Sequence, residues 1–311
     1  MHDGLNFLGV SEGLLLAIAS ALSFGASDTF AALVSRRLGA IRAATGILLV
    51  SFLGLILVAG LLRPEFRADW SWAPRVALLG GISGAAYLSL VNALRLGPVS
   101  VVAPLGASLG SVVLVLAVLL LGDRPSPLEQ LAVAGTTAGA VLVALVRAPG
   151  ERPRLNGPGP VFALVAVAGY AVSVIGLQTP IREIGWLQAL IVWRSANVTV
   201  AVLVFLLTRR RRRVAVATLP TANMIVAEAA PPWRLALPVA LVLSGLFEGG
   251  GQTLRAFSLE IAPAWLSGVA GSLGPVVVVG AGVLLFGERL GRSQVAGIVL
   301  IGIGLVLLAL A

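Results

Sequence analysis

Long apolar stretches separated by short polar connections dominate the hydrophobic pattern of this chain. A membrane-spanning helix needs about 20 mainly apolar residues. Windows of roughly this length can be drawn ten times, at 13–34, 43–62, 74–95, 98–121, 127–146, 160–178, 187–208, 235–257, 264–286 and 293–310. Most connections are short and rich in Gly, Pro and Arg, so consecutive helices should be antiparallel neighbours. The pattern predicts an all-α polytopic membrane protein with ten transmembrane helices.

The composition agrees with a membrane location and limits the chemistry. Of the 311 residues, 58% are hydrophobic and 11% are charged, whereas about a quarter of the residues in a soluble domain are charged. The chain has no Cys, and its single His is His2. This excludes thiol and imidazole catalysis and the usual transition-metal sites. We therefore expect neither an enzyme nor a bound cofactor or metal.

All 22 basic residues are arginine, and the net charge is +9. Because the arginines flank apolar stretches and are not interleaved with aromatic residues on a polar domain, they indicate contact with lipid head groups rather than with nucleic acid. The absence of lysine also rules out Schiff-base chemistry and a lysine-dependent phosphate loop.

The second half of the chain repeats the first. An offset of 165 residues superimposes several Gly, Pro and Arg positions, namely Gly80 on Gly245, Gly84 on Gly249, Pro98 on Pro263, Gly122 on Gly287, Arg124 on Arg289 and Gly139 on Gly304. The first two helices of each half need a shorter offset, which places the extra length in the connection 209–234. We expect a first repeat at 1–147, a linker at 148–158, and a second repeat at 159–311 that contains an Arg-rich loop at 209–234.

A repeat of five helices has a topological consequence. Its duplicate must enter the membrane from the opposite side, so the two halves form an inverted repeat. Many secondary transporters share this plan and bind their substrate between the halves near the middle of the membrane.

Two segments with similar sequences end the fourth helix of each half. They read Leu-Leu-Gly-Asp-Arg at 120–124 and Phe-Gly-Glu-Arg-Leu at 286–290, with Pro275 thirteen residues before Glu288. These segments resemble the EamA-type repeat of the drug/metabolite transporter superfamily. The resemblance implies two bundles of five helices, a central cavity, and transport of small organic metabolites by alternating access.

Four charged residues fall inside the predicted spans: Asp28, Arg194, Glu248 and Arg255. A charge in the membrane interior costs about 2.5–3.5 kcal/mol on insertion scales, so each is a candidate functional residue. Spacings of four, four and three residues place Ser244, Glu248, Gln252 and Arg255 on one face of the eighth helix. Glu248 could bind a cationic group or carry a proton. Alternatively, Glu248 could form a structural ion pair with Arg255 or Arg194.

Arg194 and Asp28 also leave alternatives open. Arg194 could hold a carboxylate in a bidentate manner or extend to the membrane surface. Arg42 looks like its counterpart in the first repeat. Asp28, whose counterpart lies near Ser173, could serve transport chemistry or reach water at a helix end. The remaining candidates for a binding site for substrate or protons are Tyr87, Asn92, Tyr170 and Asn197.

Glycine pairs at 80/84, 106/110, 135/139 and 245/249 are typical of helices that approach closely. We expect them to serve packing. Glu288 before the last helix favours the positive end of its dipole, which is also a structural role.

The sequence therefore predicts a multi-pass protein of the inner cell membrane that exports small metabolites such as amino acids, driven by protons or a counter-substrate. The alternative is a flippase for a lipid-linked substrate, which should have a groove of small residues open sideways to lipid. The charge bias places the connections after odd-numbered helices in the cytoplasm. The family resemblance implies the reverse orientation, with both termini cytoplasmic.

Overall fold

The computed structural model describes residues 2–62, 66, 70–96, 105–144, 158–212, 237–286 and 291–310. All regular elements within these residues are helices. In the first half they are α1 (His2–Leu38), α2 (Ala40–Leu62), α3 (Ala73–Leu96), α5 (Leu109–Leu116) with the π-helical turn η1 (Ala117–Leu121), and α6 (Pro127–Ala144). In the second half they are α7 (Pro158–Ile184), α8 (Trp186–Arg212), α9 (Leu237–Ile261), α10 (Ala264–Ala270) with the short 3₁₀ turn η2 (Gly271–Leu273), α11 (Gly274–Phe286) and α12 (Arg292–Leu310).

Each predicted window overlaps one of these helices or consecutive helical segments. Among the described residues, five helices are long and apolar enough to cross a membrane, namely those at Glu12–Ser35, Ala40–Leu62, Pro127–Ala144, Pro158–Ile184 and Trp186–Thr208. Helix α9 is long but carries Glu248 and Gln252 near its middle, which lower its hydropathy. Helices α3 and α9 are therefore long helices that do not count among these five.

Local sequence explains where the helices stop. Gly39, Gly122 and Gly185 adopt positive φ angles of 81°, 73° and 86° at helix ends, a conformation that glycine adopts without steric cost. Helix α6 begins with a capping box, because the Glu129 backbone N–H donates to Ser126 Oγ at 3.2 Å and the Ser126 N–H donates to the Glu129 carboxylate. These signals keep the connections short.

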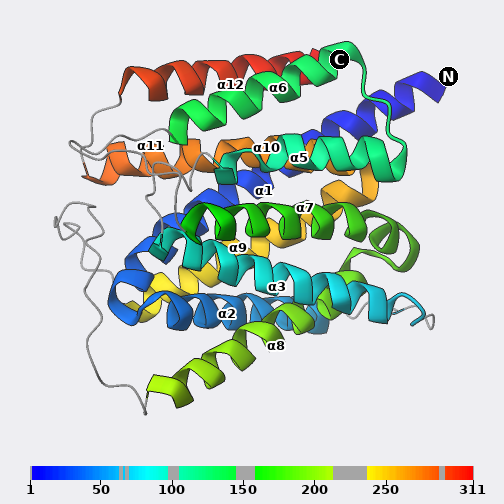
Figure 1. Ribbon diagram of the computed structural model, residues 1–311. Coiled ribbons are helices and arrows are strands. Elements are labelled where there is room, and N and C mark those ends of the chain that lie inside the picture. Colours follow the sequence, from blue (N-terminus) through cyan, green and yellow to red (C-terminus); the bar gives the residue numbers. More distant parts are fainter. Residues whose placement is uncertain are drawn as a thin grey trace.

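The helices run roughly side by side in a layered bundle (Figure 1). Helix α1 packs along α9, α3 along α7, and α6 along α12, while α2 contacts both α8 and α9. The start of α1 and the end of α12 lie at the same end of the bundle (Figure 1). Each of these pairs joins one half of the chain to the other, so the halves form one unit.

The packing contacts repeat the sequence duplication residue by residue. A Cβ atom on Gly80 would lie 2.1 Å from the Trp193 carbonyl oxygen, and one on Gly245 would lie 3.0 Å from the Ile47 carbonyl oxygen. Gly80 and Gly245 differ by 165 positions, whereas Ile47 and Trp193 differ by 146. The reciprocal contacts, α3 on α8 and α9 on α2, relate the two halves by a pseudo-twofold axis.

The next turn of the same helices confirms this register. A Cβ on Gly84 would meet the Asn197 carbonyl at 3.0 Å, and one on Gly249 would meet the Ser51 carbonyl at 3.4 Å. Since 197 − 51 is also 146, the first two helices of each half share this shorter offset. The difference, 165 − 146 = 19 residues, is the extra length between α8 and α9, as predicted.

This register corrects one sequence interpretation. Subtracting 146 from 194 makes Leu48, not Arg42, the counterpart of Arg194. Leu48 is buried, whereas Arg42 is exposed near the start of α2. The two arginines looked equivalent only because each lies early in its span.

The close-packing interpretation of the glycine pairs is only partly right. Gly139 is in tight contact, since a Cβ there would lie 2.7 Å from the Gly297 carbonyl oxygen, and Gly110 faces the Gly268 carbonyl oxygen at 3.0 Å. A Cβ on Gly106 or Gly135 would meet nothing within 4 Å. For these two positions the prediction is wrong, because neither glycine faces a neighbouring helix closely.

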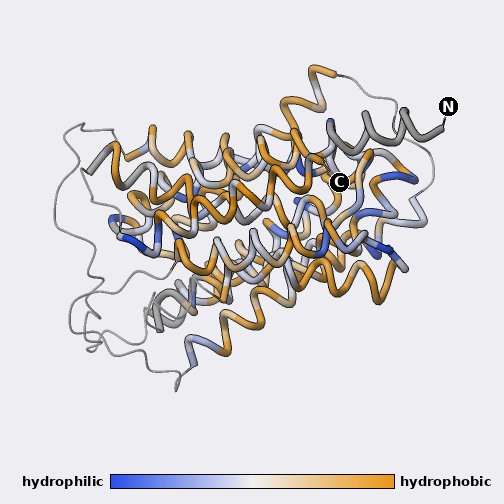
Figure 2. Tube along the Cα trace, turned by 90° about the horizontal axis from the view of Figure 1, so that it is seen from above, coloured by the Kyte–Doolittle hydropathy of each residue, from blue (hydrophilic) through white to orange (hydrophobic). Residues whose placement is uncertain are grey.

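Several sequence predictions lie outside the described residues. They concern Pro98, Glu288, Arg289, positions 148–157 of the linker and positions 213–234 of the Arg-rich loop. Hydrophobic residues predominate along the described helices (Figure 2). Large side chains such as Leu53, Leu119 and Leu284 are exposed, whereas much of the core consists of alanine and glycine contacts. This distribution is typical of helices that face lipid and pack through small residues.

Candidate substrate-binding site

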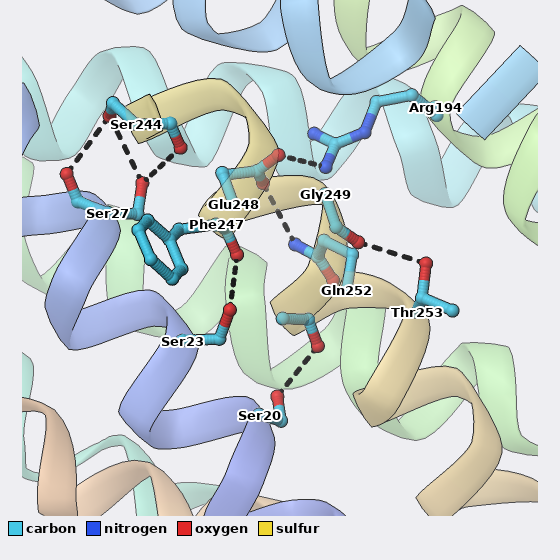
Figure 3. Close-up of polar contacts among 11 residues, drawn as sticks. Ser20, Ser23, Ser27, Arg194, Ser244, Phe247, Glu248, Gly249, Gln252 and Thr253 are labelled. Carbon is cyan, nitrogen blue, oxygen red and sulfur yellow. Dashed lines mark hydrogen bonds and ion pairs between the residues drawn. The ribbon is translucent and has the colours of Figure 1, made fainter. Parts of the chain in front are cut away.

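Helix α9 holds its polar face against α1 through serine hydroxyls. Ser20, Ser23 and Ser27 of α1 donate to the backbone carbonyls of Gly251, Phe247 and Ser244, at 2.8, 2.7 and 2.9 Å (Figure 3). The serine residues are spaced by three and four residues and therefore form one stripe on α1. They fix the rotation of α9 relative to α1, and with it the direction of the Glu248 side chain.

Both carboxylate oxygens of Glu248 accept hydrogen bonds. Arg194 of α8 donates from Nη2 to Oε2, and Gln252 donates from Nε2 to Oε1 at 3.4 Å (Figure 3). The Arg194 side chain is 1% exposed and that of Glu248 is 12% exposed. The interpretation that Arg194 extends to the membrane surface is therefore wrong, and Glu248 forms its ion pair with Arg194 rather than Arg255.

Arg194 keeps unused hydrogen-bonding capacity. Its Nη1 atom is buried without a partner, and so is Oδ1 of Asn197, three residues further along α8. One is a donor and the other an acceptor, and buried polar atoms of this kind normally have partners. Trp193, by contrast, donates from Nε1 to Ser173 Oγ at 2.9 Å, which anchors this turn of α8 to α7.

Asp28 faces the interior of the bundle and is nevertheless accessible. It interacts electrostatically with Glu248 of α9, and Tyr87 of α3 and Tyr170 of α7 interact with both acids. Four helices therefore meet around Asp28. Its side chain is nevertheless exposed. Asp28 therefore borders a space between these helices that water can enter. No hydrogen bond or ion pair within the described residues occupies its carboxylate.

Arg255 lies at the other end of the polar face of α9. Its guanidinium carbon sits 4.5 Å from the centroid of the Phe24 ring, a cation–π contact. It interacts electrostatically with Tyr170 and Glu248 but pairs with neither, and its Nε atom is buried without a partner. Phe24 is one helical turn before Asp28 on α1, so Arg255 contacts the turn of α1 that precedes Asp28.

The structure thus brings together eight of the nine predicted site residues. They are Asp28, Tyr87, Tyr170, Arg194, Asn197, Glu248, Gln252 and Arg255. For Asn92 the structure gives one hydrogen bond, which its amide donates to the Leu88 carbonyl of its own helix at 3.1 Å. Its assignment to the site stays a prediction.

Sequence reasoning missed Phe24 and the serine stripe. Phe24 looks like any apolar residue of a span until Arg255 is found over its ring. The stripe of Ser20, Ser23 and Ser27 was detectable from its helical spacing, since three hydroxyls on one face of an apolar helix predict contact with another helix.

No cluster of three or more His, Asp or Glu residues that could hold a metal ion occurs among the described residues. A separate groove lies between α3 and α8 and has a volume of about 670 Å³. Its lining is apolar and includes Ala77, Gly81, Ala85, Ala196 and Thr199. None of the polar site residues lines it, so groove and polar site are distinct.

Comparisons with known proteins agree with this architecture. The model of the EamA-like transporter family matches residues 11–145 and 157–310. No curated protein matches the sequence. Among solved structures, 29 chains match. One of them, titled only as the crystal structure of a protein, superimposes with a TM-score of 0.74 over 95% of this chain and 94% of its own length, at 17% identity. At that identity the likeness concerns the fold alone.

Proposed function

The chain belongs to the EamA-like transporter family, and from this membership we propose that it exports a small zwitterionic metabolite, such as an amino acid, by alternating access. In this proposal ten helices cross the inner cell membrane as two inverted repeats, 1–147 and 159–311, joined by a linker at 148–158. The eight clustered polar residues line the pathway between the halves.

One observation supports a zwitterionic substrate. The site has four charges, of which Arg194 and Glu248 neutralise each other. Asp28 and Arg255 remain without ionic partners. An ammonium group bound at Asp28 and a carboxylate bound at Arg255 would satisfy both, so the site suits a small molecule that carries both groups. A substrate with only one charge would leave the other protein charge uncompensated.

The ion pair has a supporting role in this proposal. Because Arg194 and Gln252 hold Glu248, its carboxylate is less available to a substrate than that of Asp28.

Coupling to protons or to a counter-substrate remains part of the proposal, and Asp28 is the acid that water can reach. Uptake by Glu248→Gln at several pH values separates the roles. An unchanged rate and an unchanged pH dependence would exclude Glu248 from coupling.

The decisive experiment measures flux in proteoliposomes loaded with a mixture of amino acids and their decarboxylated amines, read out by mass spectrometry. We expect Asp28→Asn to reduce transport of the zwitterion at least about tenfold, because a charge-assisted hydrogen bond is lost. Arg255→Met should do the same for the zwitterion but should spare an amine that lacks the carboxylate. Glu129→Gln, which changes an acid at the start of α6 and keeps the capping box, is the matched control and should transport normally.

Transport that depended on neither Asp28 nor Arg255 would contradict the zwitterion site. The groove between α3 and α8 favours the second candidate, a flippase, because its lining is apolar and half of it consists of alanine and glycine. A flippase would move a fluorescent lipid between leaflets. Gly81→Leu, which fills the groove, would then stop that movement, whereas metabolite flux would continue under our proposal.

A further inference from the structure

The end of α9 is tied to α7 by two side chains, Gln178 and Arg182, which we call the α7 latch. Arg182 donates from Nε to the Leu259 carbonyl at 3.2 Å and from Nη2 to the Ala262 carbonyl at 2.9 Å. Gln178 donates from Nε2 to the same Ala262 oxygen at 3.4 Å. The last carbonyls of a helix lack intrahelical donors and carry a partial negative charge, so a guanidinium is a well-matched partner.

Other contacts seal the same end of the bundle. Ser258 Oγ donates to the Gly13 carbonyl of α1 at 2.9 Å, and a Cβ on Gly13 would lie only 2.3 Å from the Ala262 side chain. The rings of Trp186 and Phe257 lie 4.4 Å apart. These contacts join α1, α7 and α9 at the end of the bundle where α7 turns into α8 (Figure 1).

The turn before α6, which contains Asp123, also lies near the latch. Burial raises the pKa of its carboxyl above the ordinary value, and the nearby positive charge of Arg182 opposes that shift. The turn before α6 thus lies within electrostatic range of the latch.

The pseudo-twofold relation shows that the opposite end is not closed in the same way. The counterparts of α7 and α9 are α1 and α3. Helices α7 and α9 pack on each other, whereas α1 and α3 make no extended contact in the part of the chain that the structure describes. If both ends had the same conformation, the two contacts would be alike.

Side-chain exposure shows the same asymmetry. Leu177 of α7 is 7% exposed, but its counterpart Ala31 (177 − 146) is only half-buried. Val174 is 6% exposed, but its counterpart Asp28 is exposed. The second half of α1 therefore borders open space where the second half of α7 is covered.

We infer that the α7 latch is the closed gate of the transport pathway and that the structure is the state in which the cavity opens toward the other end, between α1 and α3. The inference rests on the proposed alternating access. Because the halves are equivalent in sequence, release of the latch lets α1 and α3 adopt the contact that α7 and α9 make here.

Cysteine labelling tests this directly, since the chain contains no Cys. Two reporters at equivalent positions, Leu177→Cys and Ala31→Cys, are reacted with a membrane-impermeant maleimide in purified protein. In the parent chain we expect Ala31→Cys to react about tenfold faster or more. Adding Arg182→Met should raise the rate at Leu177→Cys roughly tenfold, the effect of losing a charge-assisted hydrogen bond. The same substitution should lower the rate at Ala31→Cys.

The matched control is Arg75→Met at the same end of the bundle. Arg75 lies over the Trp72 ring at 5.4 Å, and its removal should change neither rate. If Arg182→Met unfolds the protein, Gln178→Leu is the milder variant, because it removes only one long hydrogen bond of the latch. Its effect is read out by the same two labelling rates. We then expect changes of about two- to threefold.

Two outcomes would contradict the proposal that the α7 latch is a gate. Labelling at both reporters could stay unchanged, or it could rise at Leu177→Cys alone, which would mean local fraying. Labelling needs no substrate, so its result is independent of the zwitterion proposal. Normal labelling shifts without any metabolite flux would contradict the proposed function and leave the latch intact.

Discussion

At the level of single residues, the four intramembrane charges are unequal in what they do. Arg194 and Glu248 are buried and paired, and replacing such a pair with apolar groups is often neutral for stability, whereas breaking it leaves an uncompensated charge. Asp28 and Arg255 have no ionic partner among the described residues; Asp28 is exposed, and Arg255 lies over the Phe24 ring. Stability and transport should therefore respond to different residues.

Removing one partner of the ion pair should cost more than removing both. We expect Arg194→Gln or Glu248→Gln alone to destabilise the fold by about 3–5 kcal/mol, because the remaining charge stays buried. The double variant should lose much less. Thermal unfolding of purified protein in detergent measures the four members of this cycle. Equal losses for the single and double variants would contradict a structural cross-link between α8 and α9.

The sequence predicted these charges but could not assign their partners. The spacing of Glu248, Gln252 and Arg255 placed them on one face of a helix, which the structure bears out. The choice between Arg194 and Arg255 as the partner of Glu248 depends on how α8 and α9 are rotated. That rotation is set by contacts such as Gly80 on Trp193 and Ser27 on Ser244, which join residues far apart in the chain.

At the level of helices, glycine contacts determine how closely the two halves approach. Helix α6 offers a matched pair one turn apart. A Cβ on Gly139 would lie 2.7 Å from the Gly297 carbonyl oxygen, whereas one on Gly135 would meet nothing within 4 Å. The sequence presented both as one motif, since spacing alone does not say which glycine faces another backbone.

We expect Gly139→Ala to destabilise the contact between α6 and α12, because neither backbone can move without disturbing its own helix. Gly135→Ala should be neutral or stabilise α6 by up to about 1 kcal/mol, the helix propensity of alanine over glycine. Thermal unfolding of the two variants side by side provides the measurement. A loss at Gly135→Ala as large as that at Gly139→Ala would refute the close-packing assignment.

At the level of the whole molecule, the duplication was the strongest sequence signal, and the structure extends it to side-chain contacts. The glycine contacts of α3 with α8 and of α9 with α2 are related by both offsets, 165 for the glycines and 146 for the residues that they contact. The charges do not follow it, since the counterparts of Arg194 and Glu248 are Leu48 and Ser83. The symmetric residues build the scaffold and the asymmetric residues form the site, so the repeat reveals the fold but not the function.

The inverted arrangement makes a prediction about sidedness. If ten helices cross the membrane, the connections after even-numbered helices all face one side and those after odd-numbered helices face the other. Arg124 and Glu183 represent the first group, and Arg37 and Ser293 the second. All four side chains are exposed. The absence of cysteine allows each to be replaced singly by a reporter.

We expect Arg124→Cys and Glu183→Cys to react with an impermeant maleimide from one side of oriented vesicles, and Arg37→Cys and Ser293→Cys from the other. Detergent-opened vesicles, in which all four should react, are the control. Labelling of Arg124→Cys and Glu183→Cys from opposite sides would contradict a repeat of five membrane-spanning helices. The side that holds Arg37 also decides between the two orientations, because the charge bias places it in the cytoplasm and the family resemblance places it outside.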